Sequence, residues 1–226
     1  MPVDSLKSPD KKSPLAPEYW LVIAEYDLEG INWDRLSNFI LYKEKEIKNL
    51  NIPNNKLDDG KTLLGLQSLT ARFKHFNVLK WEHPEVFKLK DLLYSQYLCL
   101  LSELNIPRSK TFIQCWANVL RDGENIALHS HGYDEYTYLS GHITVQCNNT
   151  STIYINPFTY GADTIEVPKL NIPGKVTFFT SNIPHYTDVH IGKKERISIA
   201  FDIFLARGTH MIDSYALDNL VLFDSP

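Results

Sequence analysis

Two histidines with one residue between them, His129 and His131, stand just before a segment that alternates apolar and polar residues like a β-strand. Residues two apart in an extended segment point to the same face, so both imidazoles can converge on one ion. Imidazole is a common metal ligand in proteins. The pair alone is weak support for a metal site, because histidines in strands more often lie at the surface or hydrogen-bond within the core.

Three further features in the same half of the chain strengthen the metal-site interpretation. His185 follows the turn at Ile183-Pro184, which would place it at the start of a strand. Arg196 and Ser198 share one face of a later strand, where a guanidinium and a hydroxyl can bind a carboxylate together. Asn118 is a polar residue in an otherwise apolar strand. The order of these features predicts a barrel that holds a metal ion and an acidic co-substrate.

The elements that must position these residues differ between the two halves of the chain. In the first half we expect a strand at 19–26, a helix at 32–50 that Asn32 can cap, and a second helix at 85–104. Beyond residue 110, eight short strand candidates follow one another, separated by Gly, Pro, Asn and Asp. These strand candidates are 111–120, 126–131, 138–147, 152–156, 164–168, 174–181, 185–191 and 196–205.

Two helices followed by many short strands predict an α+β, mainly β, fold, with a jelly-roll barrel and the N-terminal helices packed on one sheet. We expect residues 1–18, which contain four prolines, to be a flexible leader. Residues 19–226 are then a single domain, with helical support at 19–109 and the barrel core at 110–205. The moderately apolar segment 210–226 is predicted to pack on the barrel or on a second subunit, which would make a homodimer.

Composition narrows the classes of function. The chain has 43% hydrophobic and 22% charged residues, as an ordinary globular protein has. Its net charge of −4 comes without a basic stripe, so nucleic acid is not an expected partner. No apolar run approaches the roughly 20 residues of a membrane span. Three cysteines without a C-x-x-C pair, and an N-terminus without a signal-like apolar run, predict reduced thiols and a cytoplasmic location.

As a set, these motifs resemble those of the 2-oxoglutarate- and iron(II)-dependent oxygenases. They look most like a bacterial and phage group with the pattern W-x-N…H-x-H…SG…H…R-x-S, and the resemblance covers about residues 110–205. It implies a double-stranded β-helix, a cupin-like barrel, with the H-x-H motif on its second strand, the later histidine on its seventh and R-x-S on its eighth. The matching residues are Trp116-Ala-Asn118, His129-Ser-His131, Ser140-Gly141, His185 and Arg196-Ile-Ser198.

The resemblance also implies an activity. Such an enzyme would use dioxygen and couple the decarboxylation of 2-oxoglutarate to oxidation of a C–H bond, so a hydroxylase is the expected function. The expected substrate is a protein or peptide side chain, with a small molecule as the second choice, and halogenation stays open. The residues implied for these roles are His129, His131 and His185 for iron(II), and Arg196, Ser198 and Asn118 for 2-oxoglutarate.

The chain departs from the family pattern at its metal ligands. His131 occupies the place where most members carry an Asp or Glu ligand, so either three imidazoles bind the iron or Asp134 or Glu135 takes over. We favour His131, because the strand fixes its place whereas the two acids fall in a loop. His190 is the main competitor of His185, but odd spacing along one strand turns it to the opposite face.

A second departure lies in the strand after Ser140-Gly141, where many relatives carry a tyrosine that hydrogen-bonds the co-substrate. His142 and Thr144 stand there instead. We expect His142 to be a packing residue, with a replacement hydrogen-bond donor as the second interpretation. Thr144 is a further candidate donor, and Tyr138 is expected to line the pocket. The two departures leave a second interpretation open, a cupin-like barrel that binds a metal or ligand without oxygenase activity.

Overall fold

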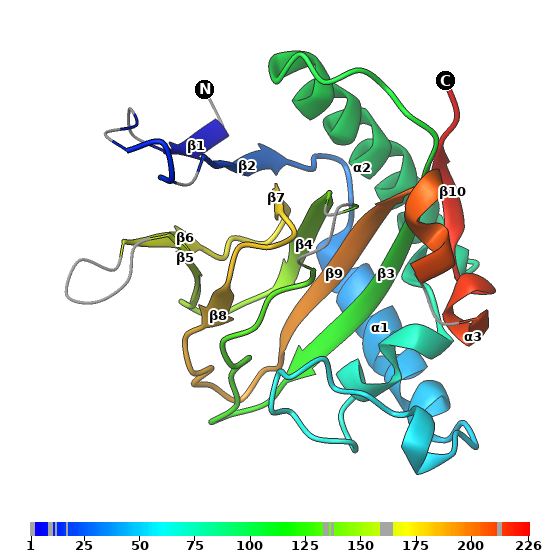
Figure 1. Ribbon diagram of the computed structural model, residues 1–226. Helices are drawn as coiled ribbons and strands as arrows, with labels where there is room; N and C mark the ends of the chain where they lie inside the picture. The colour runs from blue at the N-terminus through cyan, green and yellow to red at the C-terminus, as the bar shows by residue number, and fades with distance from the viewer. Residues whose placement is uncertain are drawn as a thin grey trace.

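Two antiparallel β-sheets lie face to face in the computed structural model, and two long helices cover the outer face of the larger sheet (Figure 1). The structure describes residues 3–8, 11, 13–16, 18–132, 136, 138–158, 165–211 and 214–226. The helices are α1 (Trp33–Lys48), α2 (Pro84–Glu103) and α3 (Ser214–Leu217), with 3₁₀ turns at Asn54–Lys56, Thr70–His75, Val78–Lys80 and Ala206–Met211. The strands are β1 (Val3–Lys7), β2 (Trp20–Asp27), β3 (Thr111–Leu120), β4 (Leu139–Gln146), β5 (Ser151–Ile155), β6 (Glu166–Leu170), β7 (Lys175–Thr180), β8 (His185–Thr187), β9 (Arg196–Leu205) and β10 (Val221–Asp224).

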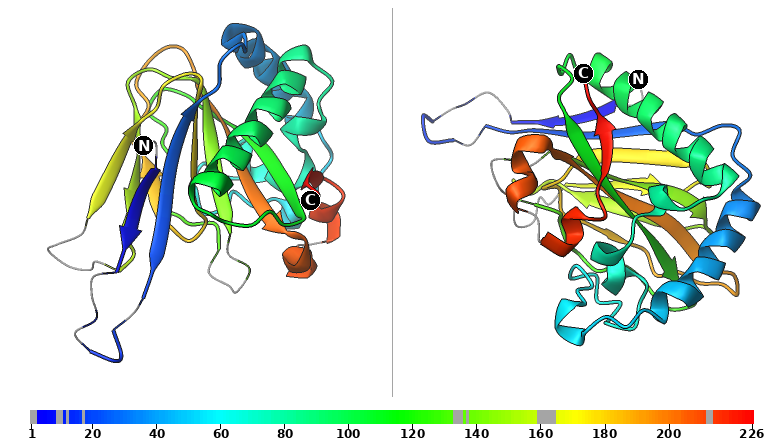
Figure 2. Two further views of the ribbon diagram at one scale, coloured as in Figure 1. Left: turned by 90° about the horizontal axis from the view of Figure 1, so that it is seen from above. Right: turned by 90° about the vertical axis from the view of Figure 1, so that its right-hand side faces the viewer.

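The larger sheet has the strand order β1-β2-β7-β4-β9-β3-β10, and the smaller one has the order β6-β5-β8. Every strand pair is antiparallel. Figure 2 shows helices α1 and α2 on one side of the larger sheet and the smaller sheet on the other. The predicted fold class, a mainly β barrel with N-terminal helical support, is confirmed.

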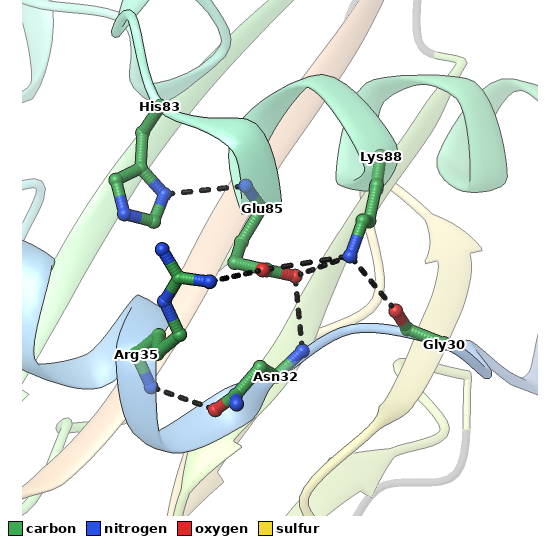
Figure 3. Close-up of polar contacts among 6 residues, drawn as sticks. All are labelled: Gly30, Asn32, Arg35, His83, Glu85 and Lys88. Atoms are coloured by element: carbon green, nitrogen blue, oxygen red, sulfur yellow. Dashed lines mark hydrogen bonds and ion pairs between the residues drawn. The ribbon is translucent and has the colours of Figure 1, made fainter.

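The two helices start side by side and are tied together there by a buried carboxylate (Figure 3). Asn32 caps α1 by accepting a hydrogen bond from the Arg35 backbone N–H, and His83 caps α2 by accepting one from the Glu85 backbone N–H. The Glu85 carboxylate accepts a bond from the Asn32 backbone N–H at 3.0 Å and pairs with Lys88 at 3.2 Å. One acidic side chain therefore satisfies the orphan N–H at the start of the other helix.

Successive side chains on the central strands β3 and β9 point to opposite faces of the larger sheet, one facing a packed core and the other a cavity. On β3 and β9 the odd-numbered side chains pack against the helices, and the even-numbered ones face the smaller sheet. Apart from Thr111 at the start of β3, the polar residues of both strands fall on the even positions. The core between sheet and helices includes Leu36, Ile40, Leu89 and Leu93 from the helices and Cys115, Ala117, Ile199 and Phe201 from the strands.

Some elements differ from the sequence prediction. Val3–Lys7, within the expected flexible leader, pairs with β2 as an edge strand, so that expectation is wrong for these residues. Segment 126–131 is not a full strand, because it forms a single bridge, His129 with His185. The expected strand 185–191 ends at Thr187, and β10 was not predicted. In the described part of the chain, no helix has the length and apolar character to span a membrane.

Candidate active site

Three histidines meet at the end of the smaller sheet. His129 and His131 come from the segment after β3, and His185 is the first residue of β8. The His129–His185 bridge aligns the two segments, through hydrogen bonds of 3.1 and 2.9 Å between their main chains. The ligating nitrogens of the three side chains lie within 4.8 Å of one another. The structure therefore brings together the three histidines that the spacing predicted.

Hydrogen bonds at Nδ1 orient the imidazole rings of His129 and His185. Nδ1 of His129 lies 2.8 Å from the Ala127 carbonyl oxygen, and Nδ1 of His185 lies 3.0 Å from the Ile183 carbonyl oxygen. Because these oxygens only accept hydrogen bonds, each Nδ1 must carry the proton. Each Nε2 then keeps its lone pair for a metal ion.

The electrostatics at His129 and His185 favour neutral rings. Burial, followed by the nearby His131, lowers the pKa of His129 to about 4. Burial, followed by His129, lowers the pKa of His185 well below its usual value. At neutral pH these two rings are therefore uncharged, which is the form that binds metals.

The triad opens into a cavity of about 390 Å³ between the two sheets. Small-molecule sites commonly have volumes of about 300–1,000 Å³, so this cavity is large enough for a small ligand. Strands β3, β4 and β9 of the larger sheet line one side, and β5 and β8 line the other. Residues 58–62, together with Thr70, Phe73 and Lys74, precede α2 and also contribute to the wall. Nothing in the composition of these segments indicates a role at the site.

A buried guanidinium lies in the same cavity. Arg196, at the start of β9, is 2% exposed, and its Nε donates to Thr150 Oγ1 at 3.1 Å. Its Nη1 has no hydrogen-bond partner, and among the described residues no carboxylate lies within ion-pairing distance. Burial lowers the pKa of Arg196 below its usual value. A buried cation without a counter-ion is costly, so an anion bound beside Arg196 would stabilise the protein.

Ser198 and Asn118 lie next to each other across strands β9 and β3, and both line the cavity. The Asn118 side-chain oxygen accepts a hydrogen bond from Thr70 Oγ1 at 2.7 Å, which fixes the amide. Trp116, two residues earlier on the same face, stacks on the His131 ring with centroids 5.8 Å apart. Trp116 and Asn118 of the W-x-N motif therefore lie at the histidine end and the polar end of one cavity.

The residues expected on β4 and near it lie differently from the prediction. His142 lines the cavity, and its Nε2 lies 2.9 Å from the Tyr154 hydroxyl, whereas its buried Nδ1 has no partner. Burial, and then Arg196, lower the pKa of His142 to about 3. Thr144 is buried beside Ser198 but is not part of the cavity wall. Tyr138 is also outside the wall, and its hydroxyl lies 3.1 Å from that of Tyr97.

Asp202 is a site residue that sequence reasoning missed. It lies on the cavity face of β9, and its Oδ1 is 2.6 Å from His131 Nδ1. The available signal was its spacing, since it follows Arg196 and Ser198 at even intervals on one strand. The alternative ligands Asp134 and Glu135 lie outside the described residues. His190 does not join the triad, and its Nε2 lies 2.7 Å from the Lys194 carbonyl oxygen.

The second residue of the S-G motif, Gly141, lies where the sheet leaves no room for a side chain. A Cβ atom at this position would lie 2.2 Å from the Phe201 ring and 2.5 Å from the Thr177 carbonyl oxygen. No side chain fits between strands β7 and β9 there, so glycine lets the sheet close behind the cavity.

Comparison with known proteins gives a fold but no sequence family. No protein-family model matches the chain. A search of curated proteins likewise finds no match.

Solved structures do match. A prolyl hydroxylase from Trichoplax adhaerens, in complex with a peptide of the hypoxia inducible factor oxygen degradation domain, has a TM-score of 0.54 at 11% identity, covering 85% of this chain and 87% of its own. A prolyl-4-hydroxylase from Pseudomonas putida has a TM-score of 0.51 at 13% identity, covering 82% and 88%. A non-haem alpha-ketoglutarate-dependent carbocyclase of nogalamycin biosynthesis has a TM-score of 0.50 at 12% identity, covering 90% and 88%. The chain therefore shares, over most of its length, the double-stranded β-helix fold of these oxygenases.

Proposed function

We propose that the protein is an iron(II)- and 2-oxoglutarate-dependent oxygenase, and within that class a hydroxylase. The observation that carries this proposal is the content of one cavity, which contains three converging imidazoles and a buried guanidinium that has no carboxylate partner among the described residues. A metal ion and an acidic small molecule would satisfy both at once. The fold shared with hydroxylases and with an alpha-ketoglutarate-dependent enzyme supports the same conclusion.

The donor set suits iron(II). Three neutral imidazole nitrogens on one side of a cavity leave the opposite side open for other ligands, and imidazole is an accepted ligand of iron. His129, His131 and His185 would hold the ion. When bound, iron(II) with 2-oxoglutarate would supply the oxidising chemistry for C–H bonds, with dioxygen as the oxidant.

The anion site would position the co-substrate. Arg196 would pair with the distal carboxylate of 2-oxoglutarate through its free guanidinium edge, and Ser198 would add a hydroxyl contact. Asn118 faces the same space, held by Thr70. We propose that His142, which lines the cavity, is the residue of β4 that contacts 2-oxoglutarate. The roles expected for Thr144 and Tyr138 stay predictions.

A protein or peptide side chain is the first substrate that we expect, and a small molecule is the second. The Trichoplax enzyme, whose fold is similar, was solved with a peptide. The cytoplasmic location and the homodimer also stay predictions.

The test is an anaerobic titration of iron(II) and then 2-oxoglutarate into the metal-free protein, followed by visible absorption. Chelation of 2-oxoglutarate on iron(II) gives a weak charge-transfer band that iron alone lacks. We expect the band with the wild-type protein and not with His185→Ala or Arg196→Met. His83→Asn is the matched control, because it removes a histidine far from the triad and keeps a residue that can cap α2.

The outcomes separate the two interpretations of the barrel. A band that depends on both His185 and Arg196 supports the oxygenase. Metal binding without a band, in the wild-type protein, would favour a metal-binding barrel without oxygenase activity. Loss of the band in His83→Asn would show that the assay reports damage to the fold instead of the site.

A further inference from the structure

The His131 imidazole is the only member of the triad whose Nδ1 contacts a carboxylate. Asp202 Oδ1 lies 2.6 Å from that nitrogen, and the Ser140 hydroxyl lies 2.6 Å from the same oxygen. Ser140 is fully buried and lies 2.8 Å from Ser181 Oγ. A hydroxyl has one proton and a carboxylate only accepts, so Ser140 donates to Asp202 and accepts from Ser181. The carboxylate is thus held in place by the protein before any ligand binds.

We propose that Asp202 is a positioning residue of the metal centre, which orients His131 and returns to the site the negative charge that a carboxylate ligand would have supplied. This inference rests on the proposed function, because it assumes that the triad binds a metal ion. It also assigns a role to the serine of the S-G motif, as the support of that carboxylate.

The geometry around His131 leaves its ring one orientation. Its backbone N–H donates to the Ser181 carbonyl oxygen at 2.9 Å, which fixes the main chain. The ring stacks on Trp116 and makes an edge-to-face contact with Phe179, at centroid distances of 5.8 and 5.7 Å. Because Nδ1 is held by Asp202, Nε2 is the nitrogen that His131 can offer to the triad.

The charge argument follows from the partners of the three rings. His129 and His185 donate to neutral backbone carbonyls, so neither brings a charge to the site. Three neutral imidazoles alone would leave a divalent ion with its full charge. Asp202, one hydrogen bond away through His131, adds one negative charge, which gives the total of a site with two histidines and one carboxylate ligand. A carboxylate partner also raises the basicity of the imidazole it holds.

The strand that carries Asp202 makes this arrangement possible. In the β9 register Asp202 lies opposite Ser140 on β4, and Arg196 and Ser198 lie on the same face of β9. Strand β9 therefore carries Arg196, which would pair with the co-substrate, near its start. Further along it carries Asp202, whose carboxylate contacts His131. The side chain of Asp202 is 17% exposed, so little water competes for the bond to His131.

The experiment measures metal affinity directly, with cobalt(II) as an air-stable probe of the iron site. Metal-free wild-type protein and the variants Asp202→Ala, Asp202→Asn, Ser140→Ala and His131→Ala are titrated with cobalt(II), and binding is followed by calorimetry and by visible absorption. Removing a partner of this kind commonly costs about 10–100-fold in metal affinity. We expect that loss in Asp202→Ala and smaller losses in Asp202→Asn and Ser140→Ala. Asp27→Asn, an exposed position outside the cavity, is the control for the same change of charge.

A second measurement does not depend on metal. In the metal-free protein, proton NMR should show a strongly downfield exchangeable imidazole proton from the short His131–Asp202 bond. It should be absent in Asp202→Ala and in His131→Ala, and present in Asp27→Asn. Thermal melting of each metal-free variant shows whether the fold has survived.

Two results would overturn the inference. If folded Asp202→Ala binds cobalt(II) as tightly as the wild type, the carboxylate does not position the centre. If His131→Ala keeps its affinity while Asp202→Ala loses it, Asp202 is itself the ligand and the positioning role is wrong. Failure of the wild type to bind any metal would instead overturn the proposed function, and the downfield proton would still report whether the His131–Asp202 bond exists.

Discussion

Replacing Arg196 by methionine should raise the stability of the ligand-free protein and at the same time abolish tight binding of 2-oxoglutarate. The guanidinium is almost completely buried, its Nη1 has no partner, and it faces no carboxylate among the described residues. Methionine has a similar length and no charge. The two effects have opposite signs because the buried positive charge of Arg196 destabilises the ligand-free protein, whereas it attracts the bound 2-oxoglutarate anion.

The magnitude for stability follows from two opposing contributions. Burying an ion costs several kcal/mol even after the protein relaxes. Against this, Arg196→Met loses the hydrogen bond to Thr150, and bonds to charged groups contribute about 1.5–3 kcal/mol. The burial cost is the larger, so the expected net gain in the free energy of unfolding is on the order of 1–3 kcal/mol. A gain of 1 kcal/mol raises the melting temperature of a chain of this size by about 2–4 °C.

The expected effect of Arg196→Met on the binding free energy of 2-oxoglutarate is larger than its effect on stability. Removing one partner of a buried ion pair costs about 3–5 kcal/mol, which is at least a hundredfold in the dissociation constant of 2-oxoglutarate. In the wild type, a ligand at 100 times its dissociation constant should add about 2.7 kcal/mol of stability. In Arg196→Met the same concentration should add almost nothing.

The assay is thermal unfolding followed by circular dichroism, with and without iron(II) and 2-oxoglutarate, under anaerobic conditions. The matched control is Arg72→Met, which removes a buried arginine whose Nη1 donates to the carbonyls of Leu66 and Ser68. That variant should melt below the wild type and still be stabilised by 2-oxoglutarate. The reasoning is refuted if Arg196→Met melts lower than the wild type, or if 2-oxoglutarate stabilises both to the same extent.

Three further predictions concern the fold around the site. Gly141→Ala forces a Cβ against Phe201 and should lower the free energy of unfolding by about 1–3 kcal/mol in urea titrations; an unchanged midpoint would contradict the close contact. Because the pKa of His142 is lowered to about 3, the unfolded chain takes up a proton between pH 6.5 and 3 that the native protein cannot. Stability should therefore fall on acidification through this range, and His142→Gln should flatten the fall in pH-dependent melting; an equal slope in both proteins would exclude this cause. Glu85→Ala leaves the Asn32 N–H without its partner and should cost about 1–3 kcal/mol, measured by urea unfolding, whereas no change would show that water replaces the carboxylate.

The residues with a local signature could be recognised before the structure. Strands β3 and β9 have the predicted bounds, and helices α1 and α2 begin and end within about two residues of the prediction, because alternation and capping residues act over short distances. The histidines and Arg196-x-Ser198 were identified for the same reason, since their even spacing along extended chain already implies a shared face.

Other features depend on partners far away in the chain. Edge strands β1 and β10 are short, and β10 pairs with β3, a strand from a distant part of the chain. Segment 126–131 alternates like a strand but finds one bridge at His129, because β8 beside it has only three residues. His142, expected to pack, was turned towards the cavity by the register of β4 against β9.

By itself, then, the sequence determined which side chains could bind a metal ion and an anion, because type and spacing are local properties. The tertiary structure decides which other residues hold these side chains in place. Asp202 reads as an ordinary polar residue in a strand, and it becomes the partner of His131 only when β9 is in register with β4 and the H-x-H segment crosses β8. Hydrogen bonds between distant segments depend on register and burial, which no local pattern encodes.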